Sequence, residues 1–164
     1  MLHASLACLL LGGCVTAQTR AAFDATQESA AARQMQPGDA AIRGNAFIHA
    51  DTGRTYTAAG DWVTLIPVTA YAEERMRVLF GPRHRREVTW LNRTDAGDPR
   101  YLALTRQVKA NIHSRFEFEN VRPGPYFVTA FVQWQRADEK FAYLIYDRVE
   151  AKAGETTEVV LSGN

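Results

Sequence analysis

The stretch Phe116-Glu117-Phe118-Glu119-Asn120-Val121-Arg122-Pro123-Gly124-Pro125-Tyr126 decides the fold. Charged and aromatic side chains alternate at its start, so we expect a strand with Phe116 and Phe118 facing inward. Pro123 presets a turn, and Gly124 permits a positive φ there. Tyr126 can then bury its ring while its hydroxyl binds a backbone group. The stretch therefore predicts two strands joined by a tight turn.

The same two-residue period continues on both sides of this stretch. Residues 42–48 and 62–67 predict two earlier strands, the second of which ends at Pro67 because proline lacks a ladder donor. Residues 101–113 also alternate and predict another strand. After the turn, inward-facing residues recur in three further segments: Tyr126, Val128, Ala130, Val132 and Trp134; Phe141, Tyr143, Ile145 and Val149; Thr157, Val159 and Leu161. Short strands separated by turns indicate an antiparallel β-sandwich.

Residues 70–80 depart from this period. Tyr71, Arg75, Val78 and Leu79 recur at helical spacing with charged residues between them, which predicts one short surface helix. The whole chain has 164 residues, of which 46% are hydrophobic, so it suits one globular domain. The formal net charge is only +1, whereas proteins that bind nucleic acids usually carry a strong excess of positive charge, so we expect no nucleic-acid partner.

Three segments together resemble the carboxypeptidase regulatory-like domains: residues 44–47, residues 59–71 and residues 116–126. The resemblance covers about residues 42–161 and implies an all-β fold, a seven-stranded antiparallel sandwich of transthyretin (prealbumin-like) topology. The residues that carry it shape the fold and say little about chemistry. Some transthyretin relatives are hydrolases with active-site histidines and a Tyr-Arg-Gly-Ser tail. This chain ends Leu161-Ser162-Gly163-Asn164 instead, which disfavours that activity.

The N-terminal segment has the pattern of an export signal. Apart from His3, residues 1–13 are apolar or small, with no Asp, Glu, Lys or Arg, and the segment is too short to cross a membrane. Leu11-Gly12-Gly13-Cys14 resembles the bacterial lipobox, which implies cleavage before Cys14 and lipid attachment to its sulfur. Val15 at the second mature position resembles the pattern sent to the outer membrane, so we expect a lipid-anchored envelope protein facing the periplasm.

Residues 14–40 predict a lipidated cysteine followed by a flexible tether, and residues 41–164 the sandwich domain. Between Val15 and Ala40 the chain is rich in Ala, Gln, Thr and Arg, and no apolar period persists. The piece from Asp24 to Met35 is rich enough in alanine for a transient helix, although isolated helices of that length are marginal in water.

Patterns typical of enzymes and metal sites are absent from the sequence. His49, His84 and His113 are widely separated and predict no zinc site, and we expect no cofactor. Asp95 and Asp98 could form a carboxylate pair, although an acidic turn is the commoner role of such residues. We therefore expect a protein that is not an enzyme.

Two groups of residues are candidates for binding. The first is an arginine-rich stretch that could recognise an anionic glycan or another envelope component, although a solvated loop face is the simpler interpretation. Its members are Arg75, Arg77, Arg83, Arg85 and Arg86, with His84 among them. The second is a set of aromatic residues that could stack on sugar rings, with Trp90 and Trp134 as the main candidates beside Tyr101, Tyr143 and Tyr146. Core packing is the commoner role for such aromatics.

These observations predict a non-enzymatic binding or scaffolding module, held at the membrane through lipidated Cys14, with an envelope protein or an anionic glycan as partner. A glycan-binding module is the alternative, and a small hydrolase of transthyretin-like type is a third interpretation. Trp90 and Trp134 exposed together on one flat face would favour sugar binding, and a pocket with a histidine near a carboxylate would favour an enzyme. A largely apolar exposed edge strand would favour a protein partner bound by strand addition.

Overall fold

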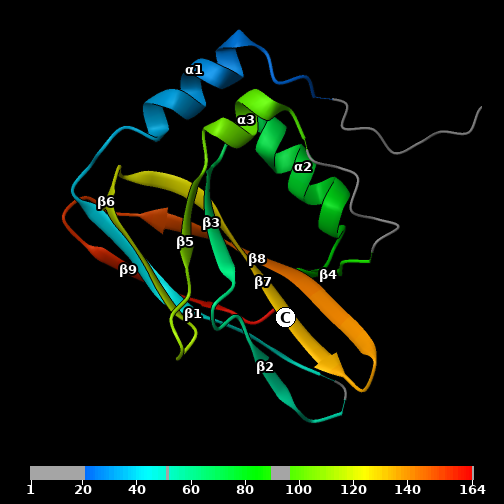
Figure 1. Cartoon of the computed structure of the whole chain (residues 1–164). Helices are drawn as coiled ribbons and strands as arrows, with labels where there is room; N and C mark the ends of the chain where they lie inside the picture. The colour runs from blue at the N-terminus through cyan, green and yellow to red at the C-terminus, as the bar shows by residue number, and fades with distance from the viewer. Residues whose placement is uncertain (1–20, 51, 90–96, 164) are drawn as a thin grey trace, which may run out of the picture.

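The computed structural model describes residues 21–50, 52–89 and 97–163. Within these ranges the chain forms nine strands and three helices, arranged as two packed sheets with the helices over the outer side of one of them (Figure 1). The expected all-β sandwich is therefore confirmed in its coarse form. The expected seven strands are wrong, since nine are present.

The four-stranded sheet is organised around the long first strand. Its strands are β1 (Ala40–His49), β2 (Thr55–Thr57), β6 (Arg115–Val121) and β9 (Thr156–Leu161). β1 pairs antiparallel with β2 and with β6, and parallel with β9. The sheet is therefore not wholly antiparallel, because the last strand, β9, runs alongside β1 in the same direction.

The five-stranded sheet is antiparallel throughout, in the order β4-β8-β7-β3-β5. The strands are β3 (Trp62–Pro67), β4 (Arg85–Glu87), β5 (Arg106–Lys109), β7 (Gly124–Arg136) and β8 (Glu139–Ala151). The β7–β8 hairpin turns at Ala137 and Asp138, and Ala137 takes the positive φ of 50° that so short a turn requires. Trp134 is thereby paired with Phe141, and Val132 with Tyr143.

The inner faces of the two sheets form the sandwich core, which contains the residues that the two-residue period places inward. Ile42, Phe118, Val128 and Ile145 are fully buried in it. Tyr126 confirms the expected corner: its ring is buried, and its hydroxyl donates to the carbonyls of Gln34 (2.8 Å) and Arg122 (2.9 Å). Gly124 has a φ of 135° at the preceding turn, which explains why glycine stands there.

The outer face of the five-stranded sheet is covered by α1 (Ala25–Gln34), α2 (Ala70–Phe80) and α3 (Pro99–Ala103) (Figure 1). A second cluster, the helix-side core, fills this layer and includes Phe23, Tyr71, Tyr101 and Phe127. The helix expected at residues 70–80 is confirmed as α2. It is more than a surface helix, because it buries residues such as Tyr71 and Met76.

The expectation of a flexible tether up to residue 40 is wrong from Phe23 onward. Phe23 is 3% exposed and packs against Tyr71 (ring centroids 5.2 Å apart) and Tyr101 (5.6 Å). Asp24 caps α1 by accepting hydrogen bonds from the amides of Thr26 and Gln27. A helix of this length is marginal alone, so packing against the sheet supplies the stability that the sequence pattern does not show.

The strand expected at residues 101–113 is only partly confirmed. α3 occupies Pro99–Ala103, and the strand is confined to Arg106–Lys109. Asp98 caps α3, accepting from the Arg100 amide, and Pro99 occupies the first turn, where its missing N–H costs nothing. The start signal for a helix therefore outweighs the alternation of Leu102 and Leu104. Among the helices described, none is long and apolar enough to cross a membrane.

Candidate functional site

The arginine-rich stretch does not form one patch. Arg75 is 7% exposed within the helix layer, and Arg77 on the same helix is exposed and pairs with Glu74 at 3.7 Å. Arg83, Arg85 and Arg86 lie after that helix, where β4 alternates its side chains between the two faces of the sheet. Arg83 and Arg85 line one surface depression, with His84 between them. The sequence stretch thus divides into separate environments.

The expected aromatic set also divides. Tyr101 and Tyr146 belong to the helix-side core, whereas Trp134 and Tyr143 lie on the inner side of the β7–β8 hairpin. Trp90 lies outside the described residues, as do Cys14, Asp95 and residues 1–13, so those predictions stay predictions. Trp134 is half-buried and does not lie on a flat exposed face.

Four near-parallel rings from three strands meet at one end of the sandwich. We call them the aromatic cluster: Tyr56 from β2, Trp134 from β7, and Phe141 and Tyr143 from β8. Trp134 is at its centre, stacked on Tyr56 with centroids 4.2 Å apart and planes 12° apart. Phe141 and Tyr143 lie 5.4 Å and 5.7 Å from Trp134, with planes 11° and 8° apart. All four rings remain partly exposed.

A depression of about 190 Å³, here the aromatic pocket, opens beside these rings. The four rings line it together with His49, Arg85 and Arg136 at its polar parts, and with Ile48, Ala50 and Thr52. Drug-sized ligands usually occupy about 300–1,000 Å³. The aromatic pocket is smaller, so it suits the face of a ring or one unit of a longer chain.

Sequence reasoning missed Tyr56, Phe141, His49 and Arg136 as site residues. Part of the signal was present: a two-residue turn at Ala137 and Asp138 pairs Trp134 with Phe141 by counting outward. Tyr56 carries no such signal, because β2 reaches Trp134 only through the packing of one sheet on the other. His49 likewise comes from the end of β1, far away in the sequence.

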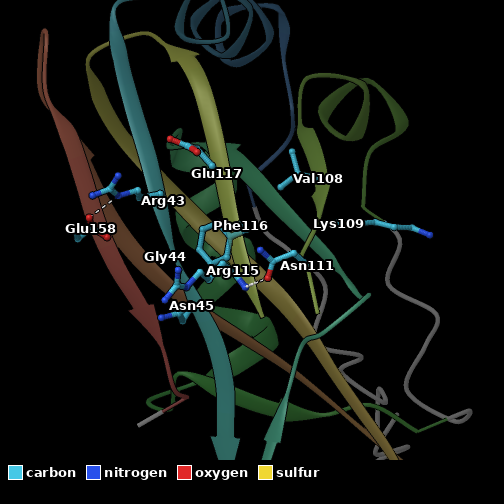
Figure 2. A pocket seen from close by; sticks show the side chains of 10 residues that line it. All are labelled: Arg43, Gly44, Asn45, Val108, Lys109, Asn111, Arg115, Phe116, Glu117 and Glu158. Carbon is cyan, nitrogen blue, oxygen red and sulfur yellow. Dashed lines mark hydrogen bonds and ion pairs between the residues drawn. The ribbon is translucent and has the colours of Figure 1, made fainter. Parts of the chain in front are cut away.

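A second depression, here the polar groove, lies over the four-stranded sheet and reaches β5; its volume is about 690 Å³ (Figure 2). Its lining mixes charges of both signs. Arg43 pairs with Glu158 at 2.6 Å, and this pairing raises the pKa of Arg43. Arg115 and Glu117 alternate along β6 beside them, and the amide of Arg115 donates to the Asn111 side chain at 3.0 Å. Among the described residues that line the groove, the one aromatic residue is Phe116, and it is only 4% exposed.

Several polar and titratable side chains outside the two depressions have structural roles. Ser114 is buried, with its hydroxyl bonded to the carbonyl of Ala46 and the amide of Ala58. Asp98 caps α3 and binds Arg100 at 2.9 Å, and hydrogen bonding to Arg100 lowers its pKa. Burial raises the pKa of Tyr101 and of Tyr126, both of which lie in cores. Among the described residues, no group of histidines, cysteines and carboxylates could hold a metal ion.

No protein-family model matches the chain, and no curated protein matches it. Among solved structures, the chain is similar to one from Pseudomonas aeruginosa described as "a putative carbohydrate binding protein". The TM-score is 0.66 and the sequence identity 20%, and the match covers 82% of this chain and 95% of that chain. At this identity the likeness shows a shared fold, which extends over nearly the whole of the other protein.

Proposed function

We propose that the protein is a carbohydrate-binding β-sandwich module of a bacterial cell envelope, with the aromatic pocket as its binding site. The observation that carries the proposal is the aromatic cluster beside an open depression. Apolar ring faces can stack on the faces of sugar rings, while Arg85, Arg136 and His49 supply polar contacts for hydroxyl groups. The fold shared with the protein from Pseudomonas aeruginosa supports the same class of ligand.

The edges of the five-stranded sheet favour a glycan over a protein partner bound by strand addition. β4 has the sequence Arg-Arg-Glu, and β5 has Arg-Gln-Val-Lys. Charged edge strands discourage pairing with another chain. Neither of the two edge strands that the structure describes in this sheet presents the apolar edge that strand addition would use.

Three parts of the proposal rest on the sequence. They are the lipid anchor at Cys14, an outer-membrane location facing the periplasm, and membership of the carboxypeptidase regulatory-like domains. The lipobox-like Leu11-Gly12-Gly13-Cys14 supports the anchor. The module acts by binding and catalyses no reaction.

The test uses the full chain in mild detergent, titrated calorimetrically with oligosaccharides chosen from a glycan array. We expect Tyr56→Ala and Phe141→Ala each to weaken binding at least about tenfold, or about 1.4 kcal/mol, because each removes one ring of the cluster. Phe141→Tyr, which keeps the ring, should retain binding. Trp62→Ala is the matched control, since Trp62 is 49% exposed and lies outside the pocket lining.

Circular dichroism and thermal melting show whether each variant is folded. Binding to no sugar on the array by the folded wild-type chain would overturn the proposal. Equal binding by the wild type and by folded Tyr56→Ala and Phe141→Ala would also overturn it, because the sugar would then bind elsewhere.

A further inference from the structure

The aromatic pocket is electrostatically one-sided. Arg85 and Arg136 line it, and none of its described lining residues carries a carboxylate. The polar groove differs, because Glu117 and Glu158 stand among its cations. The hydroxyl groups of a neutral sugar both donate and accept hydrogen bonds, so a site for such a sugar usually offers acceptors as well as donors. Two guanidinium groups without a carboxylate beside them offer only donors and positive charge, which favours an anion.

Neither guanidinium in the pocket is neutralised by a partner within the described residues. Other arginines are neutralised by carboxylates in ion pairs. These pairs are Arg43 with Glu158, Arg100 with Asp98 and Glu28, and Arg148 with Glu73. No such ion pair involves Arg85 or Arg136 in the described part of the chain. Their charges are thus available to a ligand, which would not have to displace a carboxylate first.

Arg85 is held in place by its surroundings. A Cβ added at Gly163 would lie 2.9 Å from the Arg85 Cβ and 2.9 Å from the Ile145 Cγ2, so the stem of Arg85 lies close against the C-terminal backbone. Gly163 also has a φ of 68°, a conformation that favours glycine. A packed stem leaves fewer rotamers to be lost on binding, which strengthens any contact that the guanidinium makes.

Arg85 also lines a second depression, of about 350 Å³, together with Pro82, Arg83, His84 and Gly163. No carboxylate lines this one, although Asp147 lies 3.9 Å from the His84 ring. The aromatic pocket and this depression thus share Arg85, and the charged side chains that line both of them are positive. A ligand longer than one sugar can follow this course, with its ring at the aromatic cluster and further charges beside Arg83.

From these contacts we infer that the ligand is an acidic saccharide chain, whose carboxylate or phosphate groups bind Arg85 and Arg136 while a sugar ring stacks in the aromatic cluster. This inference rests on the proposed function and specifies its ligand class. A guanidinium can bind either anion through two parallel hydrogen bonds. The anion's identity is decided by the experiment below.

The experiment compares three probes on the full chain: a trisaccharide of galacturonic acid, the same trisaccharide with its carboxyl groups reduced to alcohols, and a phosphate-bearing trisaccharide of the same sugar. We expect at least one acidic probe to bind tenfold or more tightly than the reduced one. The acidic probe that binds more tightly identifies the anion. The tighter binding should weaken as salt is raised.

The variants are Arg85→Met and Arg136→Met, alone and combined, because methionine keeps an apolar stem and removes the charge. The double variant should lose the preference for the acidic probe and most of the salt dependence. Arg115→Met is the matched control, since Arg115 is an exposed arginine of the polar groove. It should bind as the wild type does.

Equal binding of the acidic and reduced probes would overturn the inference and leave the proposed function standing. An acidic preference that persists in the folded double variant would also overturn it. Failure of the wild type to bind any of the three probes or any sugar on the array would overturn both.

Discussion

The sandwich core and the helix-side core lie on opposite faces of the same five-stranded sheet, yet they are built differently. The sandwich core is built mainly from strand residues that recur every second position, such as Phe116 and Phe118. The helix-side core joins aromatic residues of separate segments, with Phe23 and Tyr101 meeting across a long stretch of sequence. Local periodicity therefore encodes the sandwich core, whereas the helix-side core depends on packing between segments that are far apart in the sequence.

Phe118→Ala should have the largest effect on stability. Phe118 is fully buried between the two sheets, and removing its ring leaves a cavity that closely packed strands cannot fill. We expect a loss of about 3–5 kcal/mol in the free energy of unfolding. Denaturant titration followed by tryptophan fluorescence measures it. A loss below about 1 kcal/mol would show that the sandwich core does not dominate stability.

Phe23→Ala should have a smaller effect, confined to the helix layer. Phe23 packs on Tyr71 and Tyr101 at the start of α1, so its loss can be relieved by local undocking of that helix. We expect at most about 3 kcal/mol, with faster amide exchange in α1 and little change in β7. Hydrogen exchange with mass spectrometry resolves the two regions. Equal acceleration in both would contradict the comparison, because the two cores would then unfold as one unit.

Acidification should give the smallest effect and should again separate the layers. Arg100 joins α3 to α1 by binding Asp98 (2.9 Å), Glu28 (3.2 Å) and the carbonyl of Phe23 (2.6 Å). The pKa of Asp98 is lowered in the folded protein by hydrogen bonding to Arg100. Its contribution to stability is therefore complete above the unfolded pKa of about 3.9 and is lost as the pH falls through the lower folded value.

The amide signals of α1 should accordingly shift below about pH 4 in NMR spectra, while those of β7, which carries no carboxylate, change little. Asp98→Asn is the matched variant, because asparagine keeps the helix cap and removes the charge. In that variant the acid-dependent shift in α1 should be reduced. Identical acid titrations of α1 in the two proteins would show that Asp98 does not fasten the helix.

The sandwich core could be predicted from the sequence because alternating apolar and polar residues in a strand point to opposite faces of the sheet. Phe116 and Phe118, and the alternate residues from Tyr126 to Val132, are buried on the inward face that the period assigned to them. The helix-side core escaped because the outer face of β7 is also buried: Tyr126, Phe127, Val128, Thr129 and Ala130 are all buried in succession. A continuous run of buried residues is typical of a strand covered on both faces. The sequence prediction considered only the residues of this run that face the sandwich core. Nothing local marks Phe23 as the residue that packs against this layer.

The candidate site was predicted only in part for a related reason. Trp134 and Tyr143 share a face of one hairpin, so their proximity follows from local register. The arginine-rich stretch suggested one binding patch, but residues that are adjacent in the sequence need not place their side chains on one surface. Arg75 turned into the helix layer, and Arg136, from a distant hairpin, is the arginine that joins Arg85 at the aromatic pocket.

The docking of Phe23 and α1 bears on how the domain stands relative to a lipid surface. With Cys14 lipidated as proposed, six residues lie between the anchor and Ala21, and the seven Cα-to-Cα steps from Cys14 to Ala21 span at most about 25 Å when fully extended. A domain of this size has a radius of gyration of about 14 Å, which corresponds to a diameter of roughly 36 Å for a compact sphere, so the connecting segment is shorter than the domain is wide. In Figure 1, α1 lies at the opposite end from β2 and the tip of the β7–β8 hairpin. If Cys14 is lipidated as proposed, the end of the domain that carries α1 would therefore stay beside the membrane, and the aromatic pocket would point away from it.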